Sequence, residues 1–123
     1  MPKRILIVDD AAIIRMKLRK VLTENGYTVA GECANGLQAV EKYKELRPDL
    51  VTLDIVMPEM DGLETLEQIL LIDEAAKVIM ITALDQRDSL MTSIRLGATD
   101  YIIKPFEDER VVSTVQKALE SKG

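Results

Sequence analysis

Short apolar segments alternate with segments of helical spacing along all 123 residues, and this alternation constrains the fold more than any other feature. Four of the apolar segments are almost uninterrupted runs, which is typical of strands that are covered on both faces. A fifth, weaker segment suits an edge strand. The predicted strands are residues 5–8, 50–53, 78–81 and 101–103, with residues 27–30 as the edge strand.

Apolar residues recur at three- and four-residue intervals between these runs, which predicts five amphipathic helices. Gly26 and Gly97 would end the first and fourth helices, and the second should end near Arg47–Pro48. Strands that alternate with helices predict an α/β fold, (βα)5, with one five-stranded parallel sheet and helices on both of its faces. The helical apolar positions are Ile14, Leu18, Val21 and Leu22; Val40, Tyr43 and Leu46; Leu63, Leu66, Ile69 and Leu70; Leu90 and Ile94; and Val111, Val112, Val115 and Leu119.

The length of the chain suits a single domain, residues 1–123, and the last predicted helix leaves no room for an output domain. The net charge is -5, with acidic and basic residues interleaved, which argues against a nucleic-acid surface. No apolar run approaches the roughly 18 residues of a membrane span, and the N-terminus lacks a signal-peptide pattern. We therefore expect a cytoplasmic protein that binds neither nucleic acid nor membrane.

The sequence contains no histidine and one cysteine, Cys33. These counts exclude a Ser-His-Asp triad, histidine metal ligands, an internal disulfide and a cysteine-rich zinc site. Because nothing near Cys33 in the sequence would activate its thiol, we expect a small, partly buried side chain beside the edge strand.

Polar residues stand where the predicted strands end. Asp9 and Asp10 follow the first strand, Asp54 the third, Thr82 the fourth and Lys104 the fifth. Because parallel strands end at one edge of their sheet, these five side chains should converge there. Asp9 and Asp10 taken alone could equally be a helix N-cap, but three converging carboxylates repel one another unless a cation lies between them.

A hard divalent cation such as Mg²⁺ suits this set of carboxylates. The hydroxyl of Thr82 and the ammonium of Lys104 suit a phosphoryl group, whose oxygens need charge neutralisation as it is transferred. A carboxylate can act as the nucleophile and form an aspartyl phosphate. Asp54 is the best candidate, because the adjacent pair Asp9–Asp10 is better placed to hold the metal.

Four motifs together identify a family. They are ILIVDD at 5–10, DLVTLDIVMPEMDG at 49–62, VIMITA at 78–83 and GATDYIIKPF at 97–106. With these motifs the chain resembles the receiver domains of two-component response regulators, most closely the single-domain chemotaxis type. The resemblance implies a doubly wound, flavodoxin-like sheet with strand order 2-1-3-4-5.

The resemblance also assigns roles to the metal-binding and phosphorylated residues. It implies that Asp54 is phosphorylated and also binds Mg²⁺, and that Asp10 is a direct ligand of the ion. Asp9 would hold the ion through water, and the backbone carbonyl of Val56 would complete the protein ligands. By the same resemblance, Mg²⁺ is the expected cofactor.

Further roles concern the phosphoryl group and the switch. Thr82 and Lys104 would each contact a phosphoryl oxygen, and the Lys104–Pro105 bond should be cis. Tyr101 matches an aromatic residue that turns inward as Thr82 moves toward the phosphoryl group. Ordinary half-buried packing of Tyr101 is the alternative.

The implied partners are a sensor histidine kinase as phosphodonor and a target bound by the fourth helix, fifth strand and fifth helix. For a chemotaxis regulator that target would be a flagellar motor switch protein, and the chain would act as a monomer. The alternatives are a phosphorelay intermediate or the receiver module of a transcriptional regulator. In each case the protein would be a switch rather than a metabolic enzyme.

Val56 and Leu84 are apolar, whereas relatives often carry polar side chains at these two positions. In the resemblance, these positions flank the path of the water that hydrolyses the aspartyl phosphate. We hypothesise that they slow self-dephosphorylation. Val56 also argues against an aspartyl phosphohydrolase, which would need a second aspartate two residues after its nucleophile. A flavodoxin-like cofactor carrier is disfavoured because Asp9-Asp10-Ala11-Ala12 replaces the Ser/Thr/Gly-rich phosphate loop that such a carrier needs.

Overall fold

A computed structural model describes residues 2–121. Within this part of the chain five strands alternate with five α-helices, as the sequence predicts, and a short 3₁₀-helix precedes α4. The elements are β1 (Arg4–Val8), α1 (Ala12–Glu24), β2 (Thr28–Cys33), α2 (Gly36–Leu46), β3 (Leu50–Leu53), α3 (Gly62–Ile72), β4 (Val78–Ala83), η1 (Leu84–Gln86), α4 (Arg87–Leu96), β5 (Asp100–Lys104) and α5 (Asp108–Glu120).

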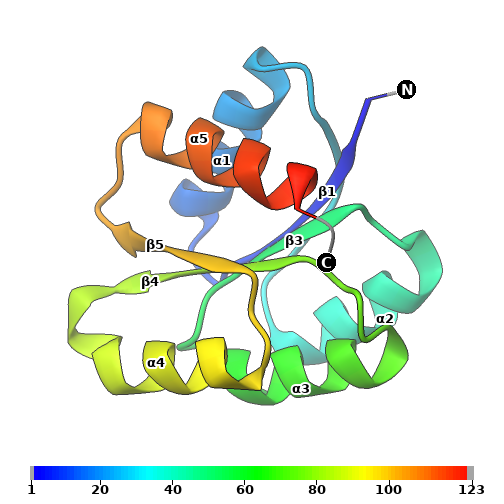
Figure 1. The fold of residues 1–123 in the computed structure, drawn as a ribbon, viewed down its shortest axis with the longest axis vertical. Coiled ribbons are helices and arrows are strands. Elements are labelled where there is room, and N and C mark those ends of the chain that lie inside the picture. The colour runs from blue at the N-terminus through cyan, green and yellow to red at the C-terminus, as the bar shows by residue number, and fades with distance from the viewer. Residues whose placement is uncertain (1, 122–123) are drawn as a thin grey trace.

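The five strands form one parallel sheet in the order β2-β1-β3-β4-β5, which confirms the predicted topology. Figure 1 shows α1 and α5 on one face of the sheet and α2, α3 and α4 on the other. The strand order reverses direction between β1 and β3, and ligands of open α/β sheets bind at such a point.

Each face of the sheet has its own apolar core, because neighbouring residues along a strand point to opposite faces. Ile5 and Ile7 of β1 pack with α1 and α5, whereas Leu6 and Val8 pack with the helices of the other face. All four side chains are at most 1% exposed. This double burial explains why the strands are continuous apolar runs and why helices cover both sides.

β2 and β4 extend furthest past the ends that the sequence pattern predicts. β2 begins at Thr28 and continues to Cys33, because its backbone pairs with β1 as far as the Val8–Cys33 pair. β4 continues through Thr82 to Ala83 and pairs there with Ile103 and Lys104 of β5. Thr82 and Lys104 are therefore held inside strands rather than in the loops that follow them.

Local signals end the helices where the sequence indicates. Gly26 and Gly97 have φ angles of 87° and 121°, which favour glycine, and they follow α1 and α4. α2 ends with Arg47 in the left-handed region, directly before Pro48. No helix within residues 2–121 is long and apolar enough to cross a membrane.

Candidate functional site

Asp9, Asp10 and Asp54 lie together at the ends of the two central strands β1 and β3. One carboxylate oxygen from each residue lies within 4.8 Å of those of the other two. Asp9 and Asp54 are 1% and 6% exposed, whereas Asp10 is exposed to solvent. The predicted convergence of the three carboxylates is thus present, with one acid open to solvent and two enclosed.

Lys104 joins the acids from β5. Its Nζ atom donates hydrogen bonds to Oδ2 of Asp9 at 2.8 Å and to Oδ2 of Asp54 at 3.1 Å. The lysine side chain is 20% exposed, so both ion pairs are largely shielded from water. Charge-assisted bonds in such surroundings are stronger than pairs on an open surface.

Burial and charge act in opposite directions on these groups. Burial raises the pKa of Asp54, and the neighbouring charge of Asp9 raises it further, while Lys104 lowers it with a smaller effect. Burial alone would lower the pKa of Lys104, but its bonds to Asp9 and Asp54 outweigh burial and raise it. The site therefore holds more negative charge than one lysine offsets, and an additional cation would relieve this repulsion.

The donor set fits Mg²⁺. This ion prefers oxygen ligands, is held by one or two carboxylates and keeps several waters, so an exposed acid beside two enclosed ones suits it. No nitrogen or sulfur side chain competes for it among the described residues of the acid cluster. Asp9, Asp10 and Asp54 are the residues that would hold it.

Thr82 lies in the adjacent strand β4, and its Oγ1 atom has no hydrogen-bond partner within the described structure. The residue is 1% exposed. A buried hydroxyl without a partner is uncommon and costs free energy, so the structure leaves a donor free beside the acids. A group with oxygen acceptors would satisfy it.

The loop after Asp54 depends on Gly62, whose role the sequence did not reveal. A Cβ atom at this position would lie 2.1 Å from the carbonyl oxygen of Asp54 and 2.6 Å from Cα of Ile55. Gly62 also donates its N–H to the carbonyl of Ile55 at 2.7 Å. The start of α3 thereby packs directly against the backbone of Asp54, and Asp61 caps that helix. Only the occurrence of Gly62 in the 49–62 motif could have signalled this contact.

Val56 and Leu84 lie outside the core, with exposed fractions of 55% and 69%. Val56 belongs to the loop after β3, and Leu84 begins the 3₁₀-helix η1 after β4. Both therefore sit just beyond strands that carry Asp54 and Thr82, where an approaching water or partner would meet apolar side chains.

Tyr101 is 39% exposed and belongs to the surface in this structure. The guanidinium of Arg110 lies over its ring at 5.9 Å and also donates to the Tyr101 carbonyl at 3.2 Å. Beside the ring is a groove between β5 and α4. The Lys104–Pro105 bond is cis, which confirms that expectation.

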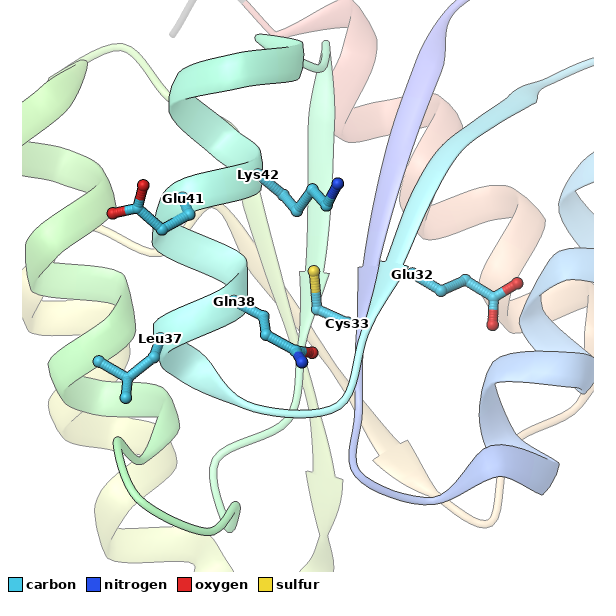
Figure 2. A pocket seen from close by; sticks show the side chains of 6 residues that line it. All are labelled: Glu32, Cys33, Leu37, Gln38, Glu41 and Lys42. Atoms are coloured by element: carbon cyan, nitrogen blue, oxygen red, sulfur yellow. The ribbon is translucent and has the colours of Figure 1, made fainter.

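Cys33 is 2% exposed, so the expectation of partial burial was wrong. It ends β2 and packs against α2, and burial is the main reason why its pKa rises to about 11. Figure 2 shows Cys33 beside a hollow between β2 and α2, with Gln38 and Lys42 around it. A buried thiol with a raised pKa is a packing residue rather than a nucleophile.

The fold and the acid site define a doubly wound α/β domain with a carboxylate pocket at the ends of its strands, and comparison with known proteins identifies its family. The family model for the response regulator receiver domain matches residues 5–116, and the chain belongs to this family. Phosphorylation and Mg²⁺ binding at an acidic pocket are typical of it, and its members receive phosphoryl groups from histidine kinases.

Two relatives and one solved structure illustrate the similarity. The chain is 52% identical over 117 residues to the chemotaxis protein CheY of Thermotoga maritima, covering 95% of this chain and 98% of that protein. It is 42% identical over 123 residues to sporulation initiation phosphotransferase F of Bacillus subtilis, covering 100% and 98%. A chain of the CheX-CheY-BeF3-Mg complex of Borrelia burgdorferi matches with a TM-score of 0.93 and 36% identity, covering 98% and 92%.

Proposed function

We propose that this receiver domain accepts a phosphoryl group on Asp54 and that Asp9, Asp10, Asp54 and the Val56 carbonyl hold Mg²⁺ during the transfer. The observation that carries this proposal is the carboxylate cluster, whose oxygens lie within 4.8 Å of one another, together with Lys104 bonded to two of its members. When bound, the ion would neutralise charge on the phosphoryl oxygens.

The transfer is an exchange of one phosphorus bond for another. A carboxylate oxygen of Asp54 forms a bond to the phosphorus of a phosphohistidine on the partner kinase. The P–N bond breaks, and the imidazole nitrogen leaves with the electron pair and takes up a proton. Lys104 supplies positive charge beside Asp54, and its two carboxylate partners keep the ammonium directed at the reacting oxygen.

The unpartnered hydroxyl of Thr82 suits the response to phosphorylation. Thr82 would donate to a phosphoryl oxygen, and Tyr101, now at the surface beneath Arg110, would turn inward into the space that this movement leaves. The phosphoryl group thereby favours one of two existing conformations. The surface formed by α4, β5 and α5, including the groove beside Tyr101, would then bind the target.

Within this scheme the chain is a single receiver domain that acts as a cytoplasmic monomer and signals by binding. The similarity to CheY proteins favours chemotaxis, with a sensor histidine kinase as donor and a flagellar motor switch protein as target. A phosphorelay intermediate is the second candidate, because the similarity to sporulation initiation phosphotransferase F spans the whole chain. A receiver module of a transcriptional regulator is a third alternative.

Labelling with a small phosphodonor tests the proposal. Wild-type protein incubated with ³²P-acetyl phosphate and Mg²⁺ should become labelled, and no label should be incorporated when EDTA is present from the start. Asp54→Asn should remain unlabelled, whereas Asp88→Asn, which removes an exposed acid on α4, should label normally. Label retained by Asp54→Asn at another residue would refute the assignment.

A further inference from the structure

Arg15 on α1 connects helix α1 to the backbone of the acid pair. Its Nη1 atom donates to the carbonyl oxygen of Asp9 at 2.7 Å. Its Nε atom lies 3.4 Å from Oε1 of Glu32 on β2. Figure 2 shows that Glu32 points away from Cys33, to the other side of β2. Arg15 is thus held by Glu32 while it bonds the residue that begins the candidate metal site.

All four polar groups of Asp9 have partners within the described structure. Its N–H donates to the carbonyl of Cys33 at 3.0 Å, and its Oδ1 accepts from the N–H of Ala11 at 2.9 Å. Its Oδ2 accepts from Lys104, and its carbonyl accepts from Arg15. The bond from Arg15 fixes the peptide unit between Asp9 and Asp10. Among the described residues, no other side chain donates a hydrogen bond to the Asp9 carbonyl.

The orientation of this peptide unit decides where the Asp10 side chain lies. Asp10 is exposed, and its backbone follows directly from the carbonyl that Arg15 holds. We propose that Arg15 is a positioning residue for Mg²⁺ binding: it fixes the Asp9–Asp10 peptide so that the carboxylate of Asp10 stays beside those of Asp9 and Asp54. This inference rests on the proposed function of the acid cluster.

A positioning role and a purely electrostatic role predict effects of opposite sign. Arg15 carries a positive charge behind three acids, so by charge alone its removal would strengthen the binding of a cation. If Arg15 positions the acids instead, its removal weakens binding, because residues that orient metal ligands commonly contribute about tenfold or more to metal affinity. The direction of the change therefore distinguishes the two roles.

Arg19 provides a matched control. Its Nε atom also bonds Glu32, at 2.5 Å, but no hydrogen bond joins its side chain to Asp9 within residues 2–121. The Arg19→Gln variant therefore removes one positive charge beside Glu32, as Arg15→Gln does, but it leaves the bond between Arg15 and the Asp9 carbonyl in place. Arg15→Lys is the conservative variant, because an ammonium can still donate to a carbonyl.

The experiment titrates MgCl2 into ¹⁵N-labelled wild-type, Arg15→Gln, Arg15→Lys and Arg19→Gln proteins and follows backbone amide resonances. We expect Arg15→Gln to raise the Kd for Mg²⁺ by about tenfold. Arg15→Lys should recover part of the affinity, and Arg19→Gln should stay within roughly twofold of wild type, since its half-exposed charge is screened. In EDTA the amide resonances of Asp10 and Ala11 should already be shifted in Arg15→Gln but not in Arg19→Gln.

Unchanged or tighter binding by Arg15→Gln would overturn the inference, as would equal weakening by Arg19→Gln. If Arg15→Gln does not fold, Arg15→Met decides the question, because its side chain keeps the apolar stem but cannot donate to the Asp9 carbonyl. A wild-type Kd and wild-type Asp10 and Ala11 shifts in Arg15→Met would contradict the proposal. Failure of the wild-type protein to bind Mg²⁺, or normal binding by Asp10→Asn, would instead refute the metal site itself.

Discussion

The ammonium nitrogen of Lys104 lies 3.1 Å from Oδ2 of Asp54, although Lys104 ends β5, Asp54 follows β3, and β4 lies between these two strands. The contact spans 50 residues of sequence and passes over the strand that carries Thr82. Lys104 also bonds Asp9, which follows β1, so one side chain of the edge strand β5 contacts the acids that follow β1 and β3.

Replacing the carboxylate of Asp54, the proposed phosphoryl acceptor, should stabilise the metal-free protein. Burial and the charge of Asp9 disfavour the ionised form of Asp54, and Asp54→Asn removes both penalties while Lys104 keeps Asp9 as a partner. We expect the free energy of unfolding in EDTA at neutral pH to rise by on the order of 1 kcal/mol. Urea unfolding followed by circular dichroism measures it, with the exposed substitution Glu41→Gln as control. A less stable Asp54→Asn would contradict the prediction.

Two buried hydroxyls without partners should each destabilise the fold. Thr52 lies between Ile7 and Ile79 in the sheet, and its Oγ1, like that of Thr82, has no hydrogen-bond partner among the described residues. Thr52→Val and Thr82→Val keep the branched shape and should each raise the free energy of unfolding by about 1 kcal/mol.

The control for these substitutions is Thr65→Val, because the Thr65 hydroxyl donates to the carbonyl of Asp61 at 2.7 Å. The free energy of unfolding of Thr65→Val should fall by about 1 kcal/mol, because the variant loses this hydrogen bond. Thr82→Val should in addition abolish the change in Tyr101 fluorescence or NMR signal on phosphorylation, whereas Thr52→Val should keep it. Destabilisation by Thr52→Val would contradict the prediction, because it would show that the Thr52 hydroxyl has a hydrogen-bond partner.

The apolar pair Val56 and Leu84 should prolong the life of the aspartyl phosphate. Both side chains are exposed beyond the strands of the site and offer no hydrogen bond to hold an attacking water. We expect Val56→Asn combined with Leu84→Glu to shorten the lifetime of ³²P-labelled protein several-fold. Leu71→Gln, which changes an exposed leucine on α3, should leave it unchanged. An unaltered lifetime of the aspartyl phosphate in the double variant would contradict the hypothesis.

Tyr43 should make the stability of the protein depend on pH in the alkaline range. Burial and the neighbouring Asp73 raise its pKa to about 12, and its hydroxyl donates to Oδ2 of Asp73 at 3.2 Å. Because the folded pKa lies above the unfolded value of about 10, the contribution of Tyr43 is complete below pH 10 and is lost as pH rises toward 12.

The comparison with Tyr43→Phe isolates this effect. The variant should be about 1 kcal/mol less stable than wild type at neutral pH, because it lacks the hydrogen bond. Above pH 10 the difference should shrink, as only the wild type can ionise at this position. Urea unfolding between pH 7 and 11 measures it, and the phenolate absorbance of wild type minus variant reports the ionisation directly. A constant difference across this range would contradict the assigned pKa.

The sequence predicts the fold and the acid site because both follow from strand ends. Once β1, β3 and β5 are placed as parallel strands, Asp9, Asp54 and Lys104 must share one edge of the sheet. The end of β2 could not be predicted, because Gly31 and Glu32 are weak strand formers and pairing with β1 decides their conformation.

Contacts with backbone atoms also escaped prediction. Arg15 bonds the carbonyl of Asp9, and Gly62 packs against the carbonyl of Asp54; neither contact depends on side-chain pattern. Helical spacing places Arg15 on α1 but does not say which carbonyl it reaches. Such relationships emerge only when the strands and helices are assembled.

Lys104 and Tyr101 are both residues of β5, and Thr82 is paired with Ile103 of the same strand. The lysine follows the tyrosine by three residue steps of extended backbone, a span of about 10 Å. The lysine of the candidate site and the tyrosine of the proposed target-binding surface therefore lie on the same strand. Under the proposed function, a displacement at the acids would reach the outer surface along this one strand, without a hinge or a moving domain.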